Sequence, residues 1–485
     1  MSDTLTFENF IDGKFLPSAG GRWLDVYEPA TGAPFARVAN SDHQDVYAAV
    51  RAAVDAGRSW TQTSADFRAA VLNRMADAIE KRCGEFAAAE SRDTGKPITL
   101  ASTVDIPRAI SNFRFFAAAT TQFASESHYE TGRSINYTLR QPLGAVACIS
   151  PWNLPIYLLS WKIAPALACG NTVVAKPSEI TPYTASLLAE VAAECGLPKG
   201  VLNFVHGSGA SAGAALVCHE EIKAVSFTGS TATGAAIAGA TASQFKKLSL
   251  EMGGKNPTLV FADCDFERTV REVARSAFTN QGQVCLCGSR ILVESSIYES
   301  FRDALLAHVS QIQSGDPESP TTTHGAIVSA DHFKKISDYL KLASEEGGTL
   351  LCGGKTRLEN RCAGGWFINP VLIEGLGNDS RINQEEIFGP VASLIPFKDE
   401  QEALMLANQC RYGLASSVWT RDINRAHRLS TQLETGLVWI NCWLRRDLRT
   451  PFGGMKHSGL GREGGWEAMK FFTEPRNVCI EFDHE

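Results

Sequence analysis

Between Leu143 and Phe261, short apolar runs alternate with stretches of helical spacing. Helical stretches follow the first four of five predicted strands, which are Ala145–Ile149, Thr172–Ala175, Leu202–Val205, Ala224–Phe227 and Lys247–Leu250. The helix after Lys176 has the clearest boundaries, because Thr181 can cap it, Pro182 suits its first turn and Gly196 suits its end. This alternation of strand and helix predicts a parallel sheet with helices on both faces.

A second block of α/β pattern begins near Asn256. Its predicted strands are Thr258–Phe261, Arg290–Val293, Ala392–Pro396, Ala415–Trp419 and Leu437–Asn441. Its predicted helices are Phe266–Asn280, Ile297–Gln313 and Glu402–Cys410. The polar stretch Gln122–Leu143, which contains the alternating piece Ser134–Leu139, is expected to form a hairpin, and Val478–Phe482 is strand-like. Neither has an obvious place in the two sheets, so pairing between subunits and a simple edge position both stay open.

Composition narrows the class of protein. A chain of 485 residues is too long for one core, so two or more domains are expected. A net charge of −7 and a pI near 5.9 disfavour a nucleic-acid or anionic-membrane partner. We expect no membrane span, because no run of about 18 apolar residues occurs, and no signal peptide, because the start is acidic. The 13 scattered cysteines lack metal-ligand spacing, which favours a reducing cytoplasm and no metal site.

Three loops carry signals for dinucleotide binding. After the strand Leu202–Val205, Gly207, Gly209 and Gly213 form a glycine-rich turn that lets a pyrophosphate approach the backbone and a helix N-terminus. The spacing is one residue longer than the usual fingerprint, so a plain structural turn is equally compatible with it. Phe227–Ser230 and Lys176–Glu179 also follow strands, although Lys176 and Glu179 are compatible with surface charges as well. Because ligands bind outside the carboxyl ends of parallel strands, the convergence of three such loops predicts a nucleotide crevice.

Cys285 is the candidate nucleophile. It lies in a polar segment that contains Gly282, which suits an exposed thiol, and a thiolate attacks carbonyl carbon readily. A lone cysteine is more often a packing residue. Cys287 is either a redox neighbour or an ordinary small residue.

Two further segments supply what such a nucleophile needs. Asn153 follows a predicted strand, where its amide can donate to an oxyanion or simply form a turn. Glu251 stands beside two glycines, where it can act as a base for water or lie on the surface.

Together these segments resemble the aldehyde dehydrogenase superfamily along the whole chain. The matching motifs, in order, are Pro151–Pro155, Lys176–Glu179, Phe227–Ser230, Leu250–Asn256, Gly282–Cys285, Glu385–Pro390 and Pro451–Lys456. Met252, where Leu is usual, is a small departure without an evident chemical consequence. The resemblance implies an α/β fold of three parts. These are a Rossmann-like NAD-binding domain (1–121 and 143–252), a catalytic domain (253–465) and a bridging sheet (122–142 and 466–485) that gives the two orphan strands a place. It also implies a homodimer or homotetramer.

The resemblance also implies roles for single residues. Cys285 would form a thioester with the substrate, Asn153 would hold the oxyanion and Glu251 would activate water. The residues implied to bind the cofactor NAD are Trp152, Lys176, Ser178, Glu179, Gly209, Gly213, Phe227, Thr228, Gly229, Ser230, Gly253, Glu386 and Phe388. The Glu179 carboxylate would repel a 2′-phosphate, so NAD is expected rather than NADP.

Within the superfamily, the chain resembles the branch that oxidises 2-aminomuconate and 2-hydroxymuconate semialdehydes. The segments that carry this likeness are Asp105–Arg108, Asn112–Phe116, Trp161–Lys162 and Asn441–Arg449. Arg108 and Arg446, with Tyr157 and Trp161, are expected to contact an anionic semialdehyde, because a cation in an apolar tunnel is costly without an anion. The alternative is that one or two of Arg445, Arg446 and Arg449, which surround Asp447, simply pair with it. Glu8–Pro17 and Cys285–Cys287 favour the 2-amino substrate over the 2-hydroxy substrate or another anionic semialdehyde.

Two classes of protein remain as rivals. A cysteine hydrolase or acyltransferase would use Cys285 but needs a histidine base, and the motif segments contain none, although the chain has ten histidines. A catalytically silent NAD-binding protein would lack the nucleophile or the base, yet both Cys285 and Glu251 are present.

Overall fold

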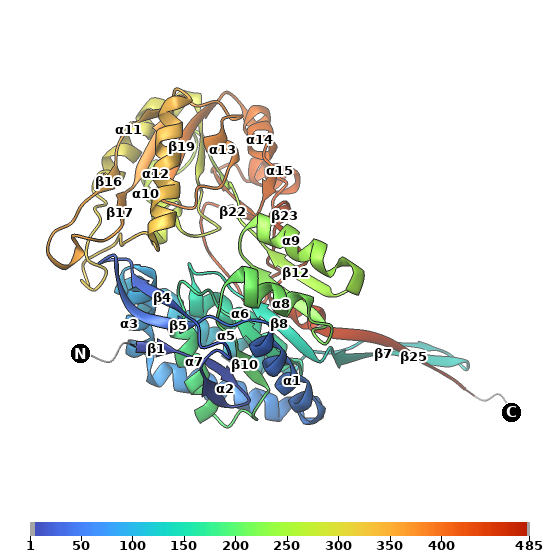
Figure 1. Ribbon diagram of the computed structural model, residues 1–485. Coiled ribbons are helices and arrows are strands. Elements are labelled where there is room, and N and C mark those ends of the chain that lie inside the picture. Colours follow the sequence, from blue (N-terminus) through green and yellow to red (C-terminus); the bar gives the residue numbers. More distant parts are fainter. Residues whose placement is uncertain (1–4, 483–485) are drawn as a thin grey trace.

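The computed structural model describes residues 5–482, which form two lobes and a protruding arm (Figure 1). The predicted α/β class is confirmed, because each lobe has a mainly parallel sheet with helices packed on it. The division of the chain into domains at the predicted boundaries stays a prediction.

The first lobe is built on an eight-stranded sheet in the order β24-β12-β11-β8-β9-β10-β2-β3. Its five central, parallel strands were all predicted, and they are β12 (Lys247–Glu251), β11 (Ala224–Thr228), β8 (Ala145–Ile149), β9 (Thr172–Lys176) and β10 (Leu202–Phe204). Three antiparallel edge strands were not predicted, namely β2 (Asn9–Ile11), β3 (Lys14–Leu16) and β24 (Gly459–Leu460). The central strands were recognisable because burial on both faces makes them continuous apolar runs.

Helices surround this sheet. They are α1 (His43–Trp60), α2 (Ala65–Lys81), α3 (Cys83–Thr94), α4 (Ile98–Leu100), α5 (Ile106–Thr120), α6 (Pro155–Ala168), α7 (Tyr183–Glu194), α8 (Ala214–Cys218), α9 (Thr231–Thr241) and α16 (Gly465–Phe471). The predicted start of α7 was wrong: Pro182 takes the capping position, and the Thr181 hydroxyl donates to the Trp152 carbonyl. The reason is that Asp93 Oδ2 from α3 already accepts the Tyr183 N–H at 2.8 Å. Gly196 follows the last residues of α7 with φ +71°, as predicted.

The second lobe contains a seven-stranded sheet in the order β15-β18-β19-β14-β13-β21-β22. The strands are β13 (Pro257–Val260), β14 (Arg290–Glu294), β15 (Thr349–Leu350), β18 (Val371–Glu374), β19 (Val391–Phe397), β21 (Ala415–Trp419) and β22 (Leu437–Ile440). The helices are α10 (Phe266–Phe278), α11 (Tyr298–Val309), α12 (Ala330–Glu345), α13 (Arg381–Gln384), α14 (Glu400–Asn408) and α15 (Ile423–Gln432). The five predicted strands are confirmed, whereas β15, β18, α12, α13 and α15 were not predicted.

The predicted helices of this lobe have shifted ends. The helix α10 stops at Phe278 rather than Asn280, because Asn280 and Gln281 adopt left-handed conformations, with φ values of +53° and +55°. The helix α14 begins two residues early because Asp399 caps it through the Glu402 N–H. The helix α11 covers Tyr298–Val309, which is shorter than predicted.

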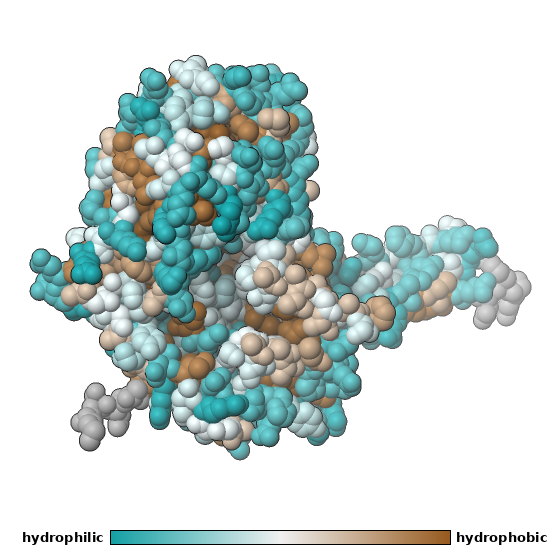
Figure 2. Space-filling model, turned by 45° about the horizontal axis from the view of Figure 1, so that its top comes forward, coloured by the Kyte–Doolittle hydropathy of each residue, from teal (hydrophilic) through white to brown (hydrophobic). Residues whose placement is uncertain are grey.

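The arm is a three-stranded antiparallel sheet, β25-β7-β6, that extends away from both lobes (Figure 1). It pairs β7 (Ser134–Pro142) with β6 (Ser127–Glu130) and with β25 (Thr473–Glu481), so the predicted hairpin and the C-terminal strand are both confirmed. The arm surface is mostly hydrophilic (Figure 2). Smaller sheets are β1 (Leu5–Phe7) with β5 (Ala33–Ala39) and β4 (Trp23–Glu28), β16 (Gly354–Thr356) with β17 (Phe367–Asn369), and β20 (Tyr412–Gly413) with β23 (Met455–Lys456).

Across residues 5–482, none of the helices combines the length and the apolar character that crossing a bilayer requires. The same part of the chain contains no group of three or more His, Cys, Asp or Glu side chains placed to hold a metal ion.

Candidate active site

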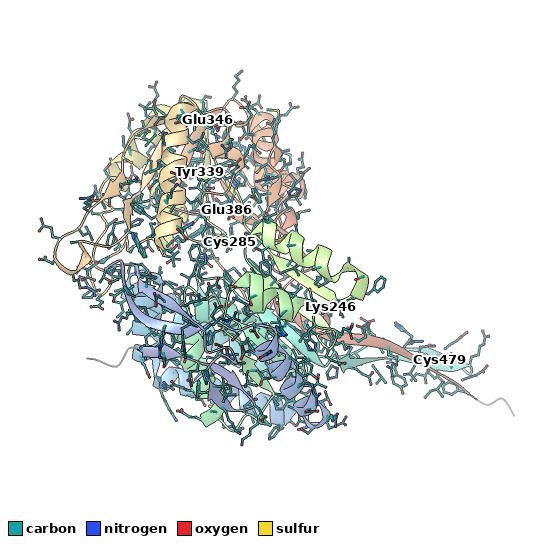
Figure 3. All side chains as sticks on the ribbon, in the orientation of Figure 1. Lys246, Cys285, Tyr339, Glu346, Glu386 and Cys479 are labelled. Carbon is teal, nitrogen blue, oxygen red and sulfur yellow. The ribbon has the colours of Figure 1, made fainter. Side chains whose placement is uncertain are left out.

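Cys285 lies where the two lobes meet, close to Glu386 (Figure 3). It follows α10 in a loop that other segments hold in place. Asn256 Nδ2 donates to the carbonyl oxygens of Cys285 at 2.7 Å and Cys287 at 2.9 Å, and Trp443 Nε1 donates to the Leu286 carbonyl at 2.9 Å. The backbone around the thiol is therefore fixed while the thiol itself stays partly exposed.

Burial raises the pKa of Cys285 to about 12, and the carboxylates of Glu386 and Glu251 contribute to that rise. The Arg446 cation acts in the opposite direction. The thiol is therefore protonated at neutral pH, and only its minor thiolate form is a nucleophile. Cys287 is buried, and burial also raises its pKa, so its thiol is not set up to react.

The Asn153 side chain is buried in the cleft that Cys285 lines. Its Nδ2 donates to the Gln283 carbonyl at 2.9 Å, and Asn280 Nδ2 donates to the Asn153 carbonyl at 3.3 Å. These bonds connect Asn153 to the loop that carries the thiol. An amide nitrogen has two hydrogens, so Asn153 can still donate one to an oxyanion beside Cys285.

Glu251 ends β12 and lines a pocket together with Cys285. Its carboxyl is 2% exposed, and within residues 5–482 neither oxygen has a hydrogen-bond partner. Burial and the nearby Glu463 raise the pKa of Glu251 well above its ordinary value. Gly453 leaves the room for this carboxyl, because a Cβ there would lie 2.7 Å from Glu251 Oε1. A buried carboxyl without a partner and with a raised pKa is suited to general acid–base chemistry.

A second buried carboxylate beside Glu251 was missed by the sequence reasoning. Glu463 Oε1 accepts a hydrogen bond from Lys162 Nζ at 2.6 Å and another from Ser226 Oγ at 3.2 Å. Glu463 lines the same pocket as Glu251, and the charge of Lys162 opposes the rise in the Glu251 pKa. The available signal was Lys162 itself, the single charged residue in the apolar helix α6.

The pocket with Cys285 and Glu251 is enclosed and mostly apolar. Of the expected substrate residues, Arg446 and Tyr157 line it, whereas Arg108 and Trp161 are not part of the lining but lie next to these two. The Arg446 guanidinium is 3.9 Å from the Phe452 ring centre and 5.8 Å from that of Trp161. The Arg108 guanidinium is 5.3 Å from the Tyr157 ring centre. All four predicted residues therefore lie in the pocket wall or next to it.

Both arginines lack an acidic partner. In the described part of the chain, no carboxylate lies within 4.0 Å of Arg108 or Arg446, whereas Arg449 Nη2 lies 2.6 Å from Asp447 Oδ2. The pairing alternative therefore applies to Arg449 and not to Arg446. Burial lowers the pKa of Arg108, and the nearby Arg446 cation lowers it further. Two cations in an apolar setting without an acidic partner are suited to binding an anion.

The predicted cofactor residues all line two adjoining cavities. One, with a volume of about 400 Å³, is lined by Trp152, Lys176, Ser178, Glu179, Gly209, Gly213, Phe227, Thr228, Gly229 and Ser230. The other contains Gly253, Glu386 and Phe388, shares the Trp152 and Thr228–Ser230 walls, and ends at Cys285. We call the two together the cofactor groove. Hydrophobic residues border the hollow between the lobes (Figure 2).

Charge and shape in the groove fit a dinucleotide. Lys176 Nζ lies 3.1 Å from Glu179 Oε2, so an ammonium and a carboxylate stand together and offer the donor and the acceptor that ribose hydroxyls can use. A Cβ added at Gly209 would meet no atom within 4 Å, which leaves its backbone open to a phosphate. At the other end, Glu386 Oε1 accepts the Gly254 N–H at 3.0 Å, and Gly253 has no side chain to block this approach.

Two residues of α12 in the groove were also missed. His332 Nε2 donates to the Phe388 carbonyl at 2.7 Å, and its ring lies 5.0 Å from that of Trp152. Lys335 Nζ donates to the Glu386 carbonyl at 3.1 Å. Burial lowers the pKa of His332 to about 4, so this histidine is neutral at physiological pH. No motif marks these residues.

Comparisons with known proteins agree with this geometry. The model of the aldehyde dehydrogenase family matches residues 15–478. The chain is 48% identical to 2-aminomuconic semialdehyde dehydrogenase of Danio rerio over 98% of both chains. It is 45% identical to 2-hydroxymuconic semialdehyde dehydrogenase of Pseudomonas sp. (strain CF600) over 98% of this chain and 99% of that one.

Solved structures give the same result for the fold. The NAD⁺ complex of an aldehyde dehydrogenase from Bacillus cereus superposes with a TM-score of 0.96 at 37% identity, over 99% of this chain and 97% of that one. An indole-3-acetaldehyde dehydrogenase in complex with NAD⁺ also reaches 0.96, at 36% identity over 99% and 98%. The expected fold is confirmed, and a cysteine hydrolase is set aside. The chain belongs to the aldehyde dehydrogenase family.

Proposed function

We propose that this enzyme uses NAD to oxidise an unsaturated semialdehyde that carries a carboxylate, with 2-aminomuconate 6-semialdehyde as the preferred substrate. The observation that carries this proposal is the pair of arginines, Arg108 and Arg446, which have no acidic partner in the described residues and lie at the pocket of Cys285. The guanidinium groups would hold the acid end while the aldehyde end reaches the thiol. The relatives divide between 2-amino and 2-hydroxy substrates, so 2-hydroxymuconate semialdehyde is the second candidate.

The proposed chemistry begins at Cys285. Its thiolate attacks the aldehyde carbon, and the Asn153 amide and the Cys285 backbone N–H stabilise the oxyanion that forms. Bound NAD supplies the acceptor for the hydride that leaves this carbon, so the acyl group remains as a thioester on Cys285. Glu251 then takes a proton from water, the water oxygen attacks the thioester, and the acid leaves as the thiol is restored.

The groove residues would orient the cofactor. Lys176 and Glu179 would hold the adenosine ribose, Glu386 the nicotinamide ribose, and Phe388 would pack beside the nicotinamide. The Glu179 carboxylate favours NAD, because a 2′-phosphate would bring two negative charges together.

The experiment compares a panel of semialdehydes by NADH absorbance at 340 nm. We expect kcat/KM to be highest for carboxylate-bearing, unsaturated aldehydes. Arg108→Ala and Arg446→Ala should each raise KM for them by about tenfold or more, because each loses a charge-assisted contact. Arg449→Ala is the matched control, since that side chain pairs with Asp447 on the surface. Equal effects of all three variants, or equal turnover of small neutral aldehydes, would contradict the proposed substrate.

We also propose a cytoplasmic homodimer or homotetramer joined through the arm. The arm supports this because β6 and β25 leave free strand edges away from both lobes (Figure 1). Sedimentation equilibrium measures the assembly, and a monomeric mass would contradict it.

A further inference from the structure

Asp105 forms part of the wall of the substrate pocket. It ends the π-helical turn η1 (Ala101–Asp105), which continues directly into α5. The pocket lining contains Asp105 together with Cys285 and Arg446. Its side chain is fully buried, and π-helical turns of this kind recur at functional sites.

One oxygen of Asp105 is paired and the other is not. Lys96 Nζ lies 2.5 Å from Asp105 Oδ2 and 3.5 Å from Glu90 Oε1, and all three side chains are fully buried. Glu90 Oε2 in turn accepts the Thr184 hydroxyl at 2.8 Å. Within residues 5–482, Asp105 Oδ1 has no hydrogen-bond partner. A buried acceptor without a hydrogen bond lowers the stability of the fold, so we expect a hydrogen-bond donor on the ligand to be its partner.

Asp105 stands one helical turn before Arg108, which places both residues on the same side of one continuous helix. Arg108 lies over Tyr157, which also lines the pocket. A carboxylate held by Arg108 therefore brings the substituent on the adjacent carbon toward Asp105. In the substrates of the relatives that carbon, C2, bears an amino or a hydroxyl group, and both groups donate hydrogen bonds.

We propose that Asp105 determines specificity at C2: its Oδ1 accepts a hydrogen bond from the amino or hydroxyl substituent next to the carboxylate. This rests on the proposed function, because Arg108 must hold the carboxylate. Lys96 holds Oδ2, which leaves Oδ1 as the oxygen without a partner, within residues 5–482, on a side chain that lines the pocket.

The test uses three semialdehydes that share the carboxylate and differ at C2: a hydroxyl, a methoxy group and a hydrogen. With the unaltered enzyme, we expect kcat/KM for the hydroxyl compound to exceed both others by about tenfold or more, because a site built to bind a donor rejects analogues without one. In Asp105→Asn, the amide oxygen should turn to Lys96 and the NH₂ group to the substrate, which reduces or reverses the preference. Glu90→Gln is the matched control, because it alters the same charge cluster without lining the pocket, and it should keep the wild-type ratio.

The outcomes separate this inference from the proposed function. If the enzyme prefers carboxylate-bearing to neutral aldehydes but treats the three C2 compounds within twofold of each other, the role of Asp105 is wrong and the proposed function stands. If Asp105→Asn and Glu90→Gln change the ratio equally, the cluster is only structural. If carboxylate-bearing aldehydes are not preferred at all, both proposals fall. If Asp105→Asn does not fold, which thermal melting would show, the lack of a C2 preference in the unaltered enzyme would still contradict this inference.

Discussion

The substrate pocket and the cofactor groove meet at Cys285, yet they differ in whether their charged side chains have partners within the protein. In the described residues of the pocket, Glu251 has no hydrogen-bond partner and Arg446 has no ion pair. In the groove, Lys176 is paired with Glu179, and Glu386 accepts a backbone N–H. Glu251 and Arg446 are therefore ready to meet water and substrate, whereas the groove is preorganised by its own contacts. The other two charged side chains that line the pocket, Glu463 and Asp105, are held by buried lysines. Changes in the pocket should cost more than changes in the groove.

The largest effect should come from the thiol where the two regions meet. We expect Cys285→Ala to lower NADH formation by about 10⁴-fold or more, because no other group can form the thioester. Cofactor binding, measured by quenching of tryptophan fluorescence with NAD, should persist because the groove is intact. Cys287→Ala is the control and should keep activity within about threefold, since its buried thiol is not set up to react. Substantial turnover by Cys285→Ala would remove the thiol from the mechanism.

The second effect concerns Glu251. We expect Glu251→Gln to lower kcat by about 10²–10⁴-fold, because the amide cannot take a proton from water. Formation of the thioester should survive, since the negative charge that Glu251 places near Cys285 is removed. Rapid mixing should therefore show a burst of one NADH per site before a slow phase. A variant without a burst would place Glu251 before the thioester instead.

The Glu251 carboxyl also determines how kcat should depend on pH. The pKa of Glu251 lies well above its ordinary value, and the protonated form cannot act as a base. The kcat of the unaltered enzyme should consequently rise with pH through that raised pKa, and Glu251→Gln should remove this dependence. A kcat that falls over the same range would contradict the assignment.

The cofactor groove was easier to predict from the sequence than the substrate pocket. Most of the groove was predictable because its loops follow buried strands, which appear as continuous apolar runs, whereas Glu386 and Phe388 follow α13 and were predicted from the resemblance alone. The charged neighbours of Glu251 were not, because Lys162 and Glu463 are 301 residues apart and nothing in the sequence indicates that the two side chains meet. His332 was missed together with α12, which was not predicted. The edge strands β2, β3 and β24 have two or three residues, too few for a periodic signal.

In the groove, Glu179→Gln should have a moderate effect. Removing the carboxylate takes away the repulsion of a 2′-phosphate, so we expect kcat/KM with NADP to rise by about tenfold while that with NAD falls slightly. Glu190→Gln, on the outer part of α7 and paired with Arg82, is the control that should change neither. NADPH and NADH formation at 340 nm measure the ratio. An unchanged preference would mean that other residues exclude NADP.

The smallest expected effect lies at His332. Phe388 has a left-handed backbone with φ +62°, which is strained for a non-glycine residue, and the hydrogen bond from His332 Nε2 to its carbonyl helps to hold it. We expect His332→Ala to raise KM for NAD about fivefold, the value of one hydrogen bond, with little change in kcat.

His332→Gln is the matched variant, because its amide can still donate, and it should stay near wild type. The pKa of His332 is about 4, so it is neutral above pH 5 and donates to the carbonyl throughout the working range. If His332 titrated between pH 5.5 and 8, KM for NAD would change over that range in the unaltered enzyme and not in His332→Gln. We expect no such change. Such a change would mean that the groove, like the pocket, uses a titrating group, and the contrast between the two regions would fail.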